Sequence, residues 1–161
     1  MLGDCFLKLD QIPGETQDRE FPGAIDVAGW SWGVNWSANR AAIKGPRHGG
    51  AADVRAFEFT HELDTASAAL LTRCVRGDPI REAVLTMRRA GGTKAQAYLQ
   101  ITFKGVQLMS VSLLHDAENL IPLERVAFAF ETVSFDYKMQ SQQGGDRTGR
   151  HNFSWSMPSE G

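Results

Sequence analysis

The stretch Trp30-Ser31-Trp32-Gly33-Val34 constrains the fold of this chain most strongly, because it alternates very large and very small side chains. Successive side chains of a β-strand point to opposite faces, so the two tryptophans share one face and the other face carries only Gly29, Ser31 and Gly33. The tryptophan face is large enough to belong to a core. The other face is almost bare backbone, which indicates either a tightly packed sheet corner or the close approach of another molecule.

Length and composition favour one globular domain over residues 1–161, because 42% of the side chains are apolar and a core is therefore available. The net charge is −2, from 17 basic and 19 acidic side chains, whereas nucleic-acid binders usually display a strongly basic surface. No apolar run approaches the roughly 20 residues of a membrane-spanning helix, and Asp4 stands where a signal peptide would be basic and then apolar. We expect a protein with no signal peptide, no membrane insertion and no nucleic-acid partner, which starts in the cytoplasm.

Period-two alternation of apolar residues predicts seven or eight strands, in the segments 6–10, 25–36, 55–59, 82–88, 98–104, 106–114, 126–137 and 153–157. A change of spacing near Ala28-Gly29 predicts a bulge in the second segment, and a slip between Phe130 and Val133 predicts a bulge or a bend from one sheet to another. Gly91-Gly92 predicts a tight hairpin between two of the strands.

A single segment, residues 65–76, has a helical pattern. Asp64, Thr65 and Ser67 are all suitable N-cap residues, and Gly77 followed by a proline ends the helix. These elements predict an all-β fold, a β-barrel formed by two mostly antiparallel sheets with one short flanking α-helix. The alternative is an α+β domain with more helix.

Two segments fit neither pattern. Residues 38–52 predict an extended, exposed loop, and residues 141–149 are rich in Gln and Gly and predict a flexible linker to a last strand. Loops of more than about 12 residues in compact domains are often functional. We therefore expect partner contact in the first segment, whose polar and turn-forming side chains are Asn39, Arg40, Lys44, Pro46, Arg47 and His48.

Motifs for catalysis, metal binding and cofactor binding are absent from the sequence. The four histidines lack the close spacing of zinc motifs, and there is neither a Gly-x-Ser-x-Gly elbow nor a phosphate-binding loop. Two cysteines, Cys5 and Cys74, are too few for a disulfide framework. The acidic side chains between residues 15 and 26 are interpreted as a solvated loop. We expect no enzyme, no metal and no cofactor.

Small or uncharged polar side chains recur on one face of several predicted strands, which is typical of a solvated sheet face and equally of a surface lining a channel. These side chains are Ser31, Thr86, Gln100, Thr102, Ser110, Ser112 and Ser134.

Taken together, the segments resemble the hemolysin-coregulated proteins (Hcp), the inner-tube subunits of bacterial type VI secretion systems. The similarity covers about nine-tenths of the chain in the family's order, and is weakest in the loop at 38–52 and after Tyr137. A proline that the family often has is Ala68 here, a substitution with little cost because Ala is a good helix former. The matching residues are Phe6-Leu7-Lys8-Leu9-Asp10, Gly14-Glu15, Ile25-Asp26-Val27, Trp30-Ser31-Trp32-Gly33-Val34, Phe59-Thr60, Asp64, Ala66-Ser67, Leu85-Thr86, Arg89-Ala90-Gly91-Gly92, Tyr98-Leu99, Ser110-Val111-Ser112 and 124–137.

The resemblance implies a subunit that assembles into a six-membered ring, whose rings stack into a hollow tube that is propelled from the cell inside a contracting sheath. Its partners would then be further copies of itself, the sheath and spike components, and type VI effectors carried in the lumen. For the lumen we expect Gly29, Ser31 and Gly33, and for ring-to-ring contact the loop at 38–52.

Two rival functions belong to other classes. A monomeric β-barrel that binds a small hydrophobic ligand would have a large enclosed cavity walled by tryptophans. A hydrolase with an unrecognised catalytic set would have a histidine beside a nucleophile in a cleft.

Overall fold

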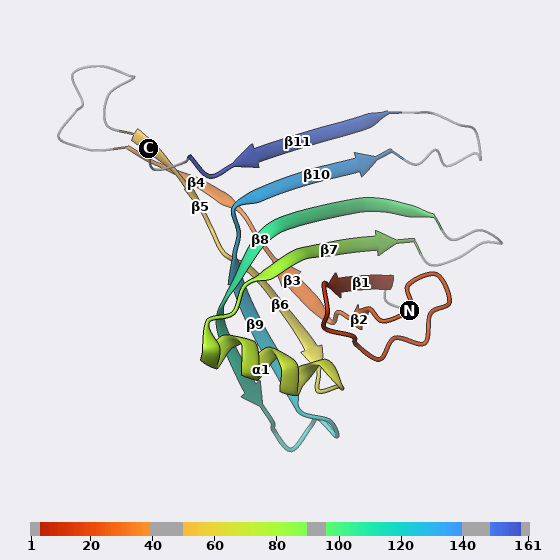
Figure 1. Ribbon diagram of the computed structural model, residues 1–161. Coiled ribbons are helices and arrows are strands. Elements are labelled where there is room, and N and C mark those ends of the chain that lie inside the picture. Colours follow the sequence, from red (N-terminus) through yellow and green to blue (C-terminus); the bar gives the residue numbers. More distant parts are fainter. Residues whose placement is uncertain (1–3, 39–49, 90–95, 140–148, 159–161) are drawn as a thin grey trace.

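The alternating segments form strands over most of the chain. The computed structural model describes residues 4–38, 50–89, 96–139 and 149–158, which form eleven strands and one helix (Figure 1). The elements are β1 (Asp4–Leu9), β2 (Ile25–Asp26), β3 (Gly29–Ser31), β4 (Val34–Ala38), β5 (Gly50–Val54), β6 (Phe57–Glu62), α1 (Ala66–Arg76), β7 (Ile80–Arg88), β8 (Ala97–Leu114), β9 (Leu123–Ala129), β10 (Thr132–Lys138) and β11 (Arg150–Ser156).

Antiparallel pairing arranges these strands in two sheets that share β8. The first sheet has the order β2-β1-β7-β8-β10-β11, and the second has the order β8-β9-β6-β3. Strands β4 and β5 pair only with each other within the described residues. The expected all-β fold with two antiparallel sheets and one helix is confirmed. The hydrogen-bonded ladder is not closed into a complete ring, because it ends at β2 on one side and at β3 on the other.

The prediction of two separate strands at 98–104 and 106–114 was wrong, because both segments belong to the single strand β8. Its first part pairs with β7 and β10, and its second part pairs with β9. Gly105, at φ +64°, and a register shift between Leu108 and Ser110 let one strand bend from the first sheet into the second. The predicted bend after Phe130 is confirmed, since β9 belongs to the second sheet and β10 to the first.

The long strand predicted at 25–36 is also wrong, because it is divided among β2, β3 and β4. Between β2 and β3 the chain leaves one sheet for the other: the Val27 amide donates to the Cys5 carbonyl at 3.0 Å, and the Ala28 amide donates to the Thr60 carbonyl at 2.8 Å. At this point β2 and β3, the edge strands of the two sheets, are joined by the chain itself and not by strand pairing. The bulge expected at Ala28-Gly29 is in fact this crossing.

Helix α1 lies over the second sheet at the end where β6 finishes (Figure 1). The Asp64 carboxylate caps it by accepting from the Ala66 amide at 2.8 Å, and Gly77 in the left-handed conformation ends it. Leu70 faces inward and is fully buried. The helix predicted at 65–76 is confirmed, with Asp64 rather than Thr65 supplying the capping oxygen.

Aromatic rings fill the space between the sheets. The ring centroid of Phe103 lies 4.9 Å from that of Phe57, 5.1 Å from that of Phe128 and 4.8 Å from that of Phe130. Phe57, Phe103 and Phe128 have no exposed surface. This cluster holds the first sheet, through Phe103, against the second.

Three predicted connections fall partly outside the described residues. The loop at 38–52 is shorter than expected, because Ala38 belongs to β4 and 50–52 belong to β5, whereas 39–49 are not described. The linker predicted at 141–149 is also shorter than expected at its end. The Gly149 carbonyl accepts from the Met139 amide at 3.0 Å, which extends the β10–β11 pairing, and 141–148 are not described. Gly91-Gly92 lies outside the described residues, although β7 and β8 pair as expected.

Replacing Phe103 with Ala is expected to lower the free energy of unfolding by roughly 3–5 kcal/mol, because it leaves a cavity among three rings. Urea unfolding followed by tryptophan fluorescence measures the loss. Phe153→Ala, at a half-exposed ring on β11, is the control and should cost far less. Equal losses in the two variants would contradict this account of the core.

Candidate assembly surfaces

The outer face of the second sheet is built from small and polar side chains. Strand register places Ser31 beside Glu58, then Ala127, then Ser110 in one row across the sheet, and the next row contains Gly29, Thr60, Arg125 and Ser112. Opposite faces of the same strands carry Trp30 and the buried phenylalanines. We call these eight residues the small-residue face.

Neither Gly29 nor Gly33 is required by packing against the described residues. A Cβ added at Gly29 would meet nothing closer than the Thr60 hydroxyl at 3.5 Å, which is an ordinary contact, and one added at Gly33 would meet nothing within 4 Å. Ser31 is exposed. A tightly packed sheet corner therefore does not account for the small side chains, whereas the approach of another molecule would.

The tryptophans lie on the other face, as the alternation predicted. The Trp30 ring stacks on Phe57 with centroids 5.7 Å apart, and Trp32 meets Phe103 and Phe130 edge-on. The Trp32 indole also donates to the Arg55 carbonyl at 2.9 Å. Both rings are partly buried and pack against the core.

One ion pair crosses the small-residue face. Arg125 on β9 contacts Glu58 on β6, with 3.3 Å between Nε and Oε1, and both side chains are substantially exposed. Neither residue was predicted as part of a site. The alternation along β6 could have indicated Glu58, because Phe57 and Phe59 point inward, but the pairing with β9 could not be read from the sequence.

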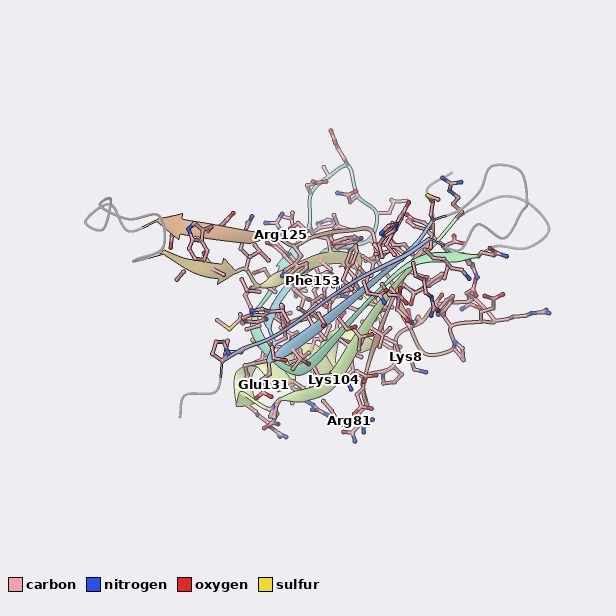
Figure 2. All side chains as sticks on the ribbon, turned by 90° about the horizontal axis from the view of Figure 1, so that it is seen from above. Lys8, Arg81, Lys104, Arg125, Glu131 and Phe153 are labelled. Atoms are coloured by element: carbon pink, nitrogen blue, oxygen red, sulfur yellow. The ribbon has the colours of Figure 1, made fainter. Side chains whose placement is uncertain are left out.

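The β4–β5 hairpin projects beyond both sheets (Figures 1 and 2). Trp36 is 69% exposed and Val34 is 47% exposed on it. The six residues predicted for ring contact, Asn39, Arg40, Lys44, Pro46, Arg47 and His48, belong to the segment between its two strands and lie outside the described residues. The structure thus places the ends of this segment but not its side chains.

Two of the strand edges that lack a partner in the described part of the chain belong to β8 and β11. From Gln107 to Leu114, β8 pairs with β9 on one side only, and β11 pairs only with β10. Met109, Leu113 and Leu114 on the β8 segment are all more than half exposed. Unpaired edges with apolar side chains offer a template on which a strand of another chain can pair.

The interior does not resemble a ligand pocket, because the phenylalanine cluster occupies it. Two of the surface depressions are open and lined mainly by polar groups; one, of about 470 Å³, is formed by Asp10, Gln11, Arg73, Pro79 and Arg81. The structure gives no support to the monomeric barrel with an enclosed hydrophobic ligand.

Among the described residues, the buried His61 forms no hydrogen bond to a nucleophile. His61 and Glu124, both without exposed surface, pair directly across β6 and β9 with 2.7 Å between Nε2 and Oε1. His61 continues the inward alternation of β6, a signal that the sequence offered. Burial raises the pKa of the Cys5 thiol to about 12, which keeps it un-ionised near neutral pH. Within the described ranges no group of His, Cys, Asp and Glu residues could hold a metal ion.

Comparison with known proteins decides the family. The family model described as "Type VI secretion system effector, Hcp" matches residues 6–137. Protein hcp1 of Pseudomonas aeruginosa is 32% identical over 157 residues, which are 98% of this chain and 96% of that protein. The chain belongs to the Hcp family.

Solved structures of Hcp proteins have the same fold. A type VI secretion system effector from Yersinia pestis is 28% identical, with a TM-score of 0.76 over 96% of this chain and all of that one. Hcp1 from Salmonella typhimurium is 29% identical, with a TM-score of 0.76 over 97% of this chain and 95% of that one. No helix in the part described here is long and apolar enough to cross a membrane.

An arginine cluster fixes the loop that precedes β2 in this Hcp chain. Arg88 on β7 donates to Asp4 at 2.6 Å, to Asp18 and to Glu20 at 3.4 Å, and its guanidinium lies over the Phe6 and Phe21 rings. The acidic stretch read as a solvated loop is therefore partly an ion-pair network. That interpretation was wrong for Asp18, whose side chain is 22% exposed and pairs with an arginine 70 residues away, whereas the Glu20 side chain is 66% exposed, as predicted.

Hydrogen bonding to Arg88 holds the pKa of Asp18 below its usual value of 3.8. A carboxylate whose folded pKa is lowered adds stability above the unfolded value, and this contribution is lost as the pH falls through the folded pKa.

We expect Asp18→Asn to lower the free energy of unfolding by roughly 1 kcal/mol at pH 7, a value discounted for partial exposure. The difference from the original chain should shrink below pH 3.8. Urea titrations between pH 3 and 7 measure it, with Glu15→Gln on the same loop as the control that shows no such trend. A difference that stays constant with pH would contradict the assignment.

Proposed function

We propose that this chain is a tube subunit of a type VI secretion system: six copies close into a ring, and rings stack into a hollow tube. Membership of the Hcp family supports this proposal. The observation on this molecule that carries it is the pair of unpaired strand edges on β8 and β11. Head-to-tail contact between different edges generates a closed ring when the rotation permits.

The small-residue face, together with the adjoining Gly33, is proposed to line the lumen, where Gly29, Ser31 and Gly33 leave the backbone accessible to cargo. Its support is that a Cβ added at Gly29 or Gly33 would meet no described atom closer than 3.5 Å. Effectors carried in the lumen would meet this face, whereas sheath and spike components would meet the outside and the ends of the tube. The protein would act as a structural carrier and not as an enzyme.

We further propose that residues 1–161 form one domain and that the protein is cytoplasmic until the apparatus fires, when it is exported with the tube. Export by this route needs no signal peptide. The segment between β4 and β5 is proposed to make the contact between rings.

The ring is tested by mass. Light scattering of the purified protein should give six times the 17.7 kDa of one chain, and negative-stain images should show annular particles. Deleting 151–161, which removes most of β11, should reduce the mass toward that of single chains, because the edge offered to the neighbouring subunit is then displaced by one strand, to β10. A monomeric mass for the intact chain at every concentration would contradict the proposal.

The lumen is tested by enlarging one side chain. Ser31→Gln should reduce capture of type VI effectors in pull-downs by about tenfold, while ring formation stays unchanged, because a long side chain obstructs the accessible backbone. Ser134→Gln makes the same change on the first sheet and serves as the control. Unchanged capture by Ser31→Gln would remove the lumen assignment without affecting the ring.

A further inference from the structure

The exposed methionines in the described part of the chain lie at the unpaired edges of β8 and β11. Met109 is 62% exposed on β8, whereas Met139 and Met157 are 44% and 56% exposed beside the two ends of β11. Met87, the remaining methionine of the described residues, is half-buried against the core. Its sulfur accepts from the Tyr98 hydroxyl at 3.6 Å. Exposure of thioether sulfur is therefore concentrated at the edges that the proposed ring would cover.

Met109 occupies the irregular position of β8. The register with β9 shifts between Leu108 and Ser110, so Met109 has no partner on β9. The segment 107–114 has no partner strand on its other side within the described ranges. Two leucines of this segment are also more than half exposed. The Met109 thioether thus belongs to an edge that is both open and apolar.

Met139 and Met157 belong to the apolar face of the β10–β11 pair. Alternation along the chain places Phe153, Trp155 and Met157 on one face of the first sheet. Met139 joins that face, because its amide donates to the Gly149 carbonyl and Gly149 lies an even number of residues before Phe153. Trp155 packs against the core, whereas Phe153 is half-exposed. The outer part of this face is only partly covered by the described residues of its own subunit.

Peroxide converts an exposed thioether into a sulfoxide in one two-electron step. A sulfur lone pair attacks one oxygen of hydrogen peroxide, the O–O bond breaks, that oxygen stays on sulfur, and water leaves. Sulfur is oxidised by two electrons and the peroxide is reduced by two. The sulfoxide is polar and accepts hydrogen bonds, so burying it without a donor costs free energy.

We propose that oxidation of Met109, Met139 and Met157 by peroxide prevents free subunits from closing into a ring. This inference rests on the proposed function, because it needs the edges of β8 and β11 to be buried between subunits. Subunits already in a ring are protected, and free subunits are the sensitive form. The Cys5 thiol is a poor competing target, because its pKa of about 12 keeps it un-ionised near neutral pH.

Oxidation before assembly tests the proposal. Two full-length chains are compared, and both carry Met87→Leu. The first keeps the three edge methionines, and the second, the leucine chain, also carries Met109→Leu, Met139→Leu and Met157→Leu. Both are unfolded in urea, treated with hydrogen peroxide, freed of peroxide with catalase and refolded. Light scattering then measures the fraction of each chain that forms rings.

We expect peroxide to reduce the fraction of rings about tenfold or more in the first chain, and to leave the leucine chain unchanged, because leucine keeps the apolar surface without sulfur. The two methionine sulfoxide reductases, one for each epimer, should restore the rings. Peptide mass spectrometry confirms that the three sites are oxidised. Rings that persist after oxidation, rings lost equally from both chains, or rings that the reductases do not restore would each overturn the inference.

Substitution by glutamine gives a second test that needs no oxidant, because it places a polar amide where the sulfoxide would lie. The chain with Met109→Gln, Met139→Gln and Met157→Gln should form about tenfold fewer rings, while its tryptophan fluorescence remains that of a folded subunit. Leucine at the same three positions is the matched control. Normal ring formation by the glutamine variant would contradict the proposal.

The untreated chain separates this inference from the proposed function. Rings of six that form equally well before and after oxidation would reject the redox dependence and keep the tube subunit. Single chains before any treatment would reject the ring, and with it the redox dependence.

Discussion

The bend in β8 is the constraint on which the rest of the structure depends. This one strand hydrogen-bonds to β7 and β10 in the first sheet and to β9 in the second, so its course sets the angle between the sheets. Gly105 makes the bend possible, because φ is +64° there and a Cβ would lie 2.6 Å from the Glu131 side chain. Once β8 bends, Phe103 on one side of Gly105 and Phe128, paired with Leu108 on the other, meet in the same aromatic cluster.

Because packed side chains fill the interior, the groups available for function lie on the surface of this protein. The rings of Trp30 and Trp32 are used in packing, and the buried His61–Glu124 pair has no access to solvent. What remains available is the small-residue face, the strand edges of β8 and β11, and the projecting hairpin. All three suit contact with macromolecules, and the edges and the hairpin suit contact with another copy of the same chain. This distribution fits a family whose members are parts of a secretion apparatus.

Local patterns in the sequence predicted the strands, the helix and the two faces around Ser31, because side-chain alternation and capping depend on neighbouring residues. They failed where distant residues decide. The strand predicted at 25–36 is divided because Cys5 and Thr60 offer carbonyls from two different sheets. The two segments on either side of Gly105 form one strand because β7, β10 and β9 pair along its length. Arg88 likewise engages Asp18 across 70 residues of sequence.

The central claim is that neighbouring subunits complete the unpaired edges of β8 and β11. Amide hydrogen exchange, read by mass spectrometry on peptides spanning 107–114 and 150–156, measures those edges directly. The account predicts slow exchange in both peptides in the purified protein, comparable to that of β7 inside the first sheet. Fast exchange in both peptides at high protein concentration, beside a protected β7, would show edges that remain open and would contradict the account.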